Sequence, residues 1–331
     1  PPLLAIISSC AAGLIGDDIE AIARGVGLSC PIAVLDSSGL SGSFADGWDK
    51  AACAVLSAFL PEQRAGQANA VNLIGMTSAY YNGENDAHEL MRFLALAGYR
   101  VNAVLGCDMS AADLSGLTQA SLNIVVHDEL GGGAARLLAE TCGMPCIAPL
   151  PPYGRAGTRK WLAEIGRVLP APRADAAEEE ITRVTREDFL RINECKSIWG
   201  ELRYETALIR APRSTAWGIA QALRTEWADV CHLAVAADAE GVPTAAPIAD
   251  EILGETDAVR IRELLNGLNG GLLIGSSNES AHINPRTAAY FPVAYPVQDA
   301  LHLSDAPFMG LRGARHIEET LWNGHILQKK I

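Results

Sequence analysis

Long apolar runs are absent from this 331-residue sequence, and their absence excludes a membrane-spanning class of protein. No uninterrupted apolar stretch approaches the roughly 18 residues that a membrane-spanning helix needs. The Pro-Pro start has neither the basic region nor the cleavage pattern of a secretory signal peptide. We therefore expect a cytoplasmic protein with no membrane partner.

Positive charge is scarce in this chain. The 26 Lys and Arg residues face 39 Asp and Glu residues, which gives a net charge of −13, and no local basic patch interrupts this balance. Such a chain repels nucleic acid, so we expect no nucleic-acid partner.

The eight cysteines include no Cys-x-x-Cys pair, which excludes a thioredoxin dithiol and a self-contained zinc ribbon. Most lie in apolar patterns, among them Cys30, Cys53 and Cys231, so reduced thiols are expected. The spacing of Cys142 and Cys146 around Gly-Met-Pro favours a helix end and the next strand over a ligand pair.

Nucleotide-binding loops are also missing. The sequence has no Gly-x-x-x-x-Gly-Lys-Ser/Thr and no complete Gly-x-Gly-x-x-Gly, so it lacks the amide cradles that hold ATP or a dinucleotide. Gly131-Gly132-Gly133 is interpreted as a flexible entry to a helix that begins at Gly133.

Short β-rich runs alternate with amphipathic helical runs along the whole chain, without hairpin signals. This order predicts an α/β protein of several Rossmann-like, doubly wound parallel-sheet domains, the first incomplete. The expected parts are a partial first domain over 1–65, a second domain over 66–170, a helical linker over 171–205 and a third domain over 206–331.

Cys10 follows a predicted strand over residues 3–7 and precedes a helix expected to begin at Asp17 or Asp18, which leaves residues 8–16 as a loop. At such a position, backbone amides and the helix dipole favour the thiolate, the form that binds metal. From position alone, a small buried residue that fills the turn is the more common role.

The segment Cys10-Ala-Ala-Gly-Leu-Ile-Gly-Asp-Asp18 resembles the cluster motif of the nitrogenase component 1 family, which includes molybdenum-iron protein chains, cofactor-assembly scaffolds and dark protochlorophyllide reductases. The rest of the chain is similar to that family in order, and more to its β-type chains. The matching segments are Gly39-Leu40-Ser41-Gly42, Gly47-Trp48-Asp49, Val71 to Gly75, Leu122 to Val125, Gly143-Met144-Pro145, Pro152-Tyr153-Gly154, Leu273 to Ser277 and Phe291-Pro292-Val293.

This resemblance implies that Cys10 ligates an iron-sulfur cluster shared with an N-terminal segment or a partner chain. Family members usually carry such a segment ahead of the motif, so we expect this sequence to be truncated there. His127 stands four residues after Asn123, where the α chain places the thiolate of its large cofactor. His127 is therefore a candidate ligand for a further metallocofactor, and a structural, hydrogen-bonded histidine is the alternative.

The implied function is that of a subunit of a nitrogenase-like oxidoreductase that relays electrons through the cluster to a substrate or metallocofactor. The alternatives are a non-catalytic scaffold for cofactor assembly and a cluster-free ligand-binding protein, and the residues do not separate an enzyme from a scaffold. The implied partners are a homologous subunit, in a dimer or tetramer, and a separate ATP-dependent iron-sulfur reductase. Apolar residues of the first strand, Leu3, Leu4 and Ile6, are expected at an interface.

Overall fold

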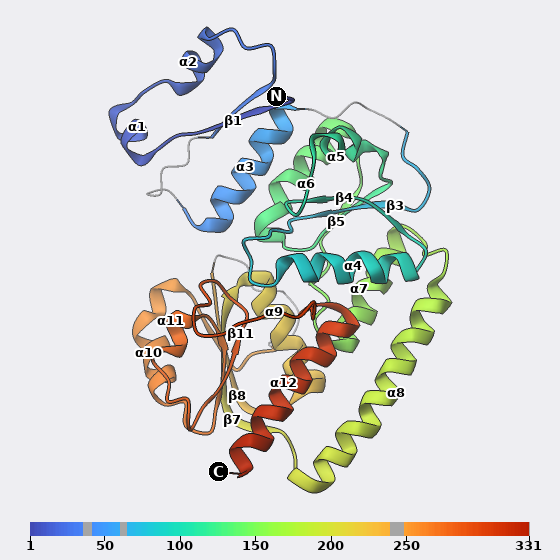
Figure 1. Ribbon diagram of the computed structural model, residues 1–331, viewed down its shortest axis with the longest axis vertical. Coiled ribbons are helices and arrows are strands. Elements are labelled where there is room, and N and C mark those ends of the chain that lie inside the picture. Colours follow the sequence, from blue (N-terminus) through green and yellow to red (C-terminus); the bar gives the residue numbers. More distant parts are fainter. Residues whose placement is uncertain (36–41, 60–64, 239–247, 331) are drawn as a thin grey trace. The chain divides into compact units, whose positions relative to one another are not determined.

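The computed structural model describes residues 1–35, 42–59, 65–238 and 248–330 (Figure 1). All the strand pairs in these ranges are parallel, and helices connect them. The predicted α/β class with Rossmann-like sheets is thus confirmed. None of the helices in these ranges is both long and apolar enough to cross a membrane.

The chain folds into two compact units, residues 1–77 with 99–149 and residues 78–98 with 150–331. The first unit holds a two-stranded and a four-stranded sheet, and the second unit holds a five-stranded sheet. The domain bounds expected from the sequence stay a prediction.

The two-stranded sheet pairs β1 (Leu4–Ile7) with β2 (Ile32–Leu35). Between them lie α1 (Cys10–Ile15) and α2 (Ile19–Gly25). The loop predicted for residues 8–16 is therefore wrong, because most of those residues form a helix of their own.

Local capping explains both helices. The Ser9 side chain accepts a hydrogen bond from the Ala12 N–H and begins α1, and Gly16, with a φ of 81°, ends it. The Asp18 carboxylate accepts a hydrogen bond from the Ala21 N–H at 2.9 Å and begins α2. Each cap satisfies a backbone donor that the first turn leaves without a partner.

The helix α3 (Phe44–Ala58) begins with a capping box in which Ser43 and Asp46 exchange hydrogen bonds. The predicted glycine and serine loop before it, with the family-like motif Gly39-Leu40-Ser41-Gly42, lies outside the described residues apart from its last two positions.

The four-stranded sheet has the order β4-β3-β5-β6. Its central strand β3 is buried at every position, which is typical of parallel sheets between helices and agrees with the unbroken apolar run around it. The elements of this part are β3 (Ala70–Ile74), β4 (Arg100–Leu105), α5 (Ala111–Gly116), η1 (Leu117–Gln119), β5 (Leu122–Val125), α6 (Asp128–Cys142) and β6 (Cys146–Ile147).

A chain of side-chain amides crosses the middle of this sheet. Asn72 on β3 and Asn123 on β5 are completely buried. The Asn72 Nδ2 donates to Asn123 Oδ1 at 2.8 Å and to the Leu117 carbonyl at 2.9 Å, and Asn102 Nδ2 of β4 donates to Asn72 Oδ1 at 2.9 Å. Asn72 thereby ties three strands to the segment that follows α5.

Replacing Asn72 by alanine is expected to lower the free energy of unfolding by about 2–4 kcal/mol, because the change removes a hydrogen-bond partner from three polar groups inside the sheet. The matched control is Asn193→Ala, at an exposed position on a helix, where a change within about 0.5 kcal/mol is expected. Urea unfolding followed by circular dichroism measures both. Equal stability of the two variants would contradict the role given to the amide chain.

The five-stranded sheet of the second unit has the order β11-β10-β7-β8-β9. The register pairs Leu208 of β7 with Ala234 of β8, and both side chains pack with α10, whereas α9 contacts the same two strands. The elements are β7 (Arg203–Pro212), α9 (Arg213–Ala222), the π-helical turn η2 (Leu223–Trp227), β8 (Asp229–Asp238), β9 (Glu251–Leu253), η3 (Glu255–Asp257), α10 (Ala258–Asn266), β10 (Leu272–Gly275), α11 (Ser277–Ser280) and β11 (Ala289–Pro292).

Four further helices belong to this unit: α4 (Gly83–Leu96), α7 (Gly154–Val168), α8 (Ala174–Trp199) and α12 (Gly310–Lys330). In Figure 1, α10 and α12 lie on opposite sides of the five-stranded sheet. The helix α8 occupies most of the stretch expected to be a helical linker, and it packs against α4, α7 and α12.

Candidate functional site

The Cys10 thiol is exposed at the first residue of α1, shortly after the end of β1. Ser9, the residue before it, caps the helix, so the backbone at Cys10 is fixed while its side chain remains accessible. The exposure excludes the more common role of a small buried residue that fills the turn. An exposed thiol at a fixed backbone position suits a ligand that is completed from outside this segment.

The surface around Cys10 is apolar. Leu14 is 77% exposed and Ile15 is 75% exposed on the same short helix, and Ile7 at the end of β1 and Ile22 on α2 are exposed as well. Exposed apolar side chains this close together are typical of an interaction surface, and here they lie around the motif.

The residues of the first strand that were expected to need cover behave differently. Leu3, Leu4 and Ile6 are only partly exposed. The apolar surface of this segment is therefore formed by the helices and the end of the strand, and an interface at the strand itself stays a prediction.

His127 lies directly after β5, at the residue before α6, and is 3% exposed. Burial lowers the pKa of His127 to about 4, so the imidazole is neutral near pH 7. Its Nδ1 lies 3.9 Å from Glu129 Oε1. A neutral imidazole is the form that ligates a metal, but it is equally the form of a structural histidine.

Cys10 and His127 follow strands of different sheets in the first unit, β1 and β5. The link between these two parts is Asp49 of α3, whose carboxylate accepts hydrogen bonds from the backbone N–H groups of Gly133 and Ala134 on α6, at 2.9 and 3.2 Å. Nothing in the sequence indicates this contact, because Asp49 resembles an ordinary polar residue of a helix.

The three glycines of α6 have a packing role. Because α6 begins at Asp128, Gly131 to Gly133 lie within the helix, and the predicted helix entry at this place is wrong. A Cβ on Gly133 would lie 2.2 Å from Asp49 Oδ2, and a Cβ on Gly131 would lie 2.7 Å from Gly75 Cα. These positions are small so that α3 and the end of β3 can approach α6.

The remaining cysteines offer no second metal-binding group. All eight lie in the described ranges and none forms a disulfide, and no three Cys, His, Asp or Glu side chains in these ranges are placed to hold a metal ion. As predicted, α6 ends at Cys142 and β6 begins at Cys146. Cys231, however, is exposed on β8 rather than apolar in its surroundings, and Arg203 Nη2 lies 2.9 Å from its sulfur.

A hollow of about 600 Å³ lies beside the Cys10 segment, lined by residues of β1, β2, α3 and the turn between α1 and α2. Its polar lining consists of carboxylates and hydroxyls, including Asp17, Asp18 and Ser57. It contributes no thiolate or imidazole, the donors that iron-sulfur clusters use. The hollow is therefore not a cluster site on its own.

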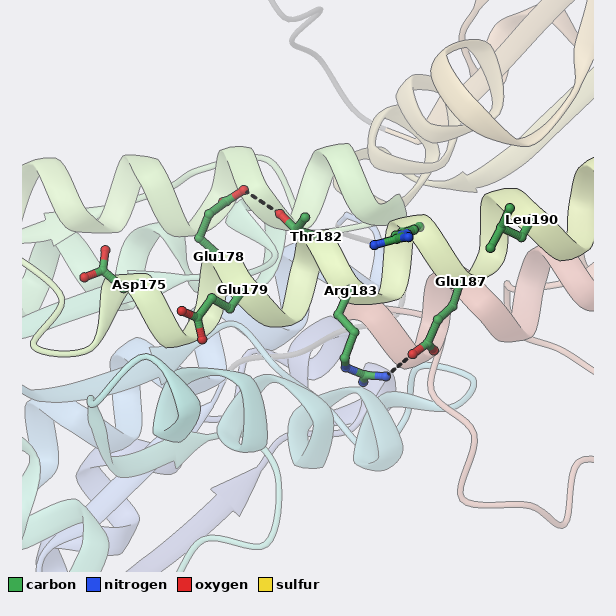
Figure 2. A pocket seen from close by; sticks show the side chains of 8 residues that line it. Asp175, Glu178, Glu179, Thr182, Arg183, Glu187 and Leu190 are labelled. Atoms are coloured by element: carbon green, nitrogen blue, oxygen red, sulfur yellow. Dashed lines mark hydrogen bonds and ion pairs between the residues drawn. The ribbon is translucent and has the colours of Figure 1, made fainter.

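A second hollow, of about 730 Å³, runs along α8 (Figure 2). Its charges are paired along the same helix or with its neighbours: Arg183 binds Glu180 and Glu187, and Glu178 binds Arg159. These pairs are exposed and describe a solvated helix surface. The hollow is lined by Asp175, Glu178, Glu179, Thr182, Arg183, Arg186, Glu187 and Leu190.

Parallel sheets whose strand order reverses next to β3 and next to β7 define an α/β protein with Rossmann-like parts. The chain belongs to the nitrogenase component 1 type oxidoreductase family, whose model matches residues 1–324. The resemblance seen in the Cys10 motif is thus confirmed at the level of the family.

Curated relatives are named as one of the subunits of light-independent protochlorophyllide reductase. The protein of Prosthecochloris aestuarii is 29% identical over 174 residues, which cover 50% of this chain and 31% of that protein. The protein of Rhodospirillum rubrum is 29% identical over 197 residues, which cover 56% of this chain and 36% of that protein. The matched segment spans about a third of the length of these relatives.

Two solved structures titled nitrogenase Cp1, at pH 6.5 and pH 5, share the fold. The first has a TM-score of 0.78 at 13% identity and covers 99% of this chain and 76% of its own. The second has a TM-score of 0.76 at 19% identity and covers 100% of this chain and 72% of its own. At these identities, the likeness concerns the fold alone.

Proposed function

We propose that this chain is a subunit of a nitrogenase-like reductase and that Cys10 supplies one thiolate to an iron-sulfur cluster shared between chains. The observation that carries the proposal is the exposed Cys10 thiol at the start of α1, surrounded by exposed apolar side chains such as Leu14 and Ile15. A ligand on an apolar surface is placed where a second polypeptide can bury it and complete the coordination.

The donors in this chain fit a shared cluster and do not fit a self-contained one. An iron-sulfur cluster takes about four protein ligands, mostly thiolates. In the part of the chain that the structure describes, no group of three metal-binding side chains exists, so Cys10 provides one ligand and the others come from a further segment or a homologous subunit. When bound, the cluster would supply one-electron transfer.

His127 is the candidate ligand for a further metallocofactor, second to Cys10. Its neutral imidazole at the carboxyl end of β5 supports this role, because ligands of α/β sheets bind beyond the strand ends. With 3% exposure, the side chain needs a local opening before it reaches a bound group.

Electrons would arrive by protein docking. The sequence has no Gly-x-x-x-x-Gly-Lys-Ser/Thr loop and no dinucleotide fingerprint, so ATP hydrolysis and nicotinamide binding are assigned to a separate iron-sulfur reductase. The net charge of −13 favours a partner with a basic rim. Among the substrates of the family, the name of the curated relatives favours a tetrapyrrole over dinitrogen.

The proposal predicts that reduction of a tetrapyrrole substrate requires the partner protein and MgATP. The purified native complex is assayed anaerobically with dithionite, with and without the ATP-hydrolysing reductase and MgATP. Turnover only when both are present is the expected result. Sustained turnover without them would contradict the electron route, and bound iron with no turnover under any condition would favour the assembly-scaffold alternative.

A further inference from the structure

Charged side chains from four elements meet inside the second unit. Arg155 of α7 binds Glu318 of α12 directly through Nη2, and its Nε lies 3.5 Å from Glu226 Oε2 of η2. Its Nη1 lies 3.7 Å from Asp188 Oδ2 of α8. One guanidinium therefore stands among three carboxyl groups that come from three different elements.

The charges in this cluster do not balance. A second cation, Arg315 of α12, reaches its edge: the Arg315 Nε binds Asp188 Oδ1 at 2.8 Å and its Nη2 binds Glu187 at 2.9 Å. Even if Arg315 is counted fully toward the cluster, two positive charges face Asp188, Glu226 and Glu318. With all three ionised, one negative charge is left without compensation.

The surplus charge would be buried. The side chains of Arg155, Asp188 and Glu318 are 8%, 8% and 6% exposed, and Glu226 is 14% exposed. The contact with Glu318 is the close one, because among the described residues Arg155 Nη1 and Asp188 Oδ2 have no hydrogen-bond partner. Burial of an uncompensated carboxylate costs several kcal/mol in general, and a bound proton removes this cost.

A second buried carboxyl holds the same helix at its other end. Asp86 of α4 accepts hydrogen bonds from the backbone N–H groups of Phe308 and Met309, just before α12 begins at Gly310, at 2.6 and 2.8 Å. The charged group that acts on it is the carboxylate of Glu89, which raises the pKa of Asp86 beyond the effect of burial. Two arginines, Arg92 and Arg312, pair with Glu89.

We propose that α12 is held by a proton-dependent latch, in which Glu318 and Asp86 keep the helix packed when protonated and loosen it from α7, α8 and α4 when they lose their protons. The inference concerns the second unit alone and does not depend on a cluster at Cys10. Its ligand is the proton, and its moving part is one helix.

The pKa shifts of both groups agree with this charge count. Burial raises the pKa of Glu318 to about 7, against the attraction of Arg155 and with a further rise from Glu226 and Asp188. Burial also raises the pKa of Asp86 to about 7, against its two backbone hydrogen bonds. Burial raises the pKa of Glu226 too, mainly against the attraction of Arg155.

The sign of the pH effect follows from these shifts. A carboxyl whose pKa is higher in the folded than in the unfolded chain binds more protons when folded, so its stabilising effect is complete at acidic pH. That effect is lost as the pH rises from the unfolded value toward the folded value of about 7. The latch therefore closes in mild acid and opens above neutral pH.

Hydrogen exchange of the α12 amides between pH 5.5 and 8.5, corrected for the intrinsic rate, tests the latch in the native protein. We expect opening of α12 to become about tenfold or more frequent over this range, since one pKa unit corresponds to a factor of ten. Glu318→Gln should remove a large part of the change, and Glu318→Gln with Asp86→Asn should remove nearly all of it.

The matched control is Glu319→Gln, at the exposed position next to Glu318 on α12, which should keep the full pH dependence. The same pH dependence in Glu318→Gln and Glu319→Gln would overturn the proposal. Infrared spectra of the unmodified protein provide a test that needs no variant. They should show a protonated buried carboxyl at pH 6 that disappears by pH 8.5, and its absence at pH 6 would equally overturn the latch.

Discussion

An Arg155→Ala variant is expected to lose about 3–5 kcal/mol of its free energy of unfolding at pH 7.5, because the substitution leaves buried carboxylates without their cation. Arg155 is the residue that Glu226 and Glu318 both face, whereas Arg315 pairs with Asp188. Denaturant unfolding measures the loss. The loss should shrink at pH 5, where protonation of the carboxyl groups removes the repulsion.

The control for this variant is Arg159→Ala, one turn further along α7. Arg159 pairs with Glu178 at the surface, where the two side chains are 45% and 53% exposed, and such pairs contribute less than about 1 kcal/mol. A loss in Arg155→Ala no larger than that in Arg159→Ala would show that the buried cluster does not hold the helices of this unit together.

Replacing Cys10 by serine in the native complex is expected to remove iron from the shared cluster and to lower reductase turnover at least about 100-fold, since even changes to partners of a metal ligand cost 10–100-fold. Serine keeps the size and the helix start at Ser9 but is a poor iron ligand. Iron analysis and EPR spectra of the anaerobically purified complex, together with the turnover assay, measure the effect.

Cys146→Ser is the control for Cys10→Ser, because Cys146 is the other exposed thiol of the first unit and follows no cluster motif. It should retain the iron content, the EPR signal and the turnover of the unmodified complex. Unchanged iron and EPR signal in Cys10→Ser would remove Cys10 from the ligand set, whatever its effect on activity.

The parallel sheets were predictable from the sequence because their central strands are uninterrupted apolar runs. Ala70–Ile74, Leu122–Val125 and Leu272–Gly275 are buried at every position, as strands covered by helices on both faces must be. The edge strand Glu251–Leu253 was missed, because three residues with a charge among them carry no periodic signal.

The helix α1 could not be recognised from its apolar pattern, because its six residues include a glycine and follow a serine cap that is common in loops. Gly131 to Gly133 misled in the opposite direction. Glycine indicates a loop by propensity, but here the contacts of Asp49 and Gly75 with α6 require residues without a side chain. For these glycines, tertiary packing decided the structure.

The candidate site was predictable only in part. The motif from Cys10 to Asp18 indicated the family from nine consecutive residues, and the exposure of the thiol depended on the fold. The Arg155 cluster had no sequence signal at all. Its members lie between positions 155 and 318, and each is of a type that usually remains at the surface.

The most direct test of a cluster shared through Cys10 is a crystal structure of the anaerobically purified native complex, with anomalous diffraction recorded at the iron edge. We predict iron bonded to the Cys10 sulfur, with the remaining ligands of the cluster supplied from a further segment or a partner chain. A fully loaded complex with no iron at Cys10, or with Cys10 buried against a partner and not bonded to metal, would contradict this claim.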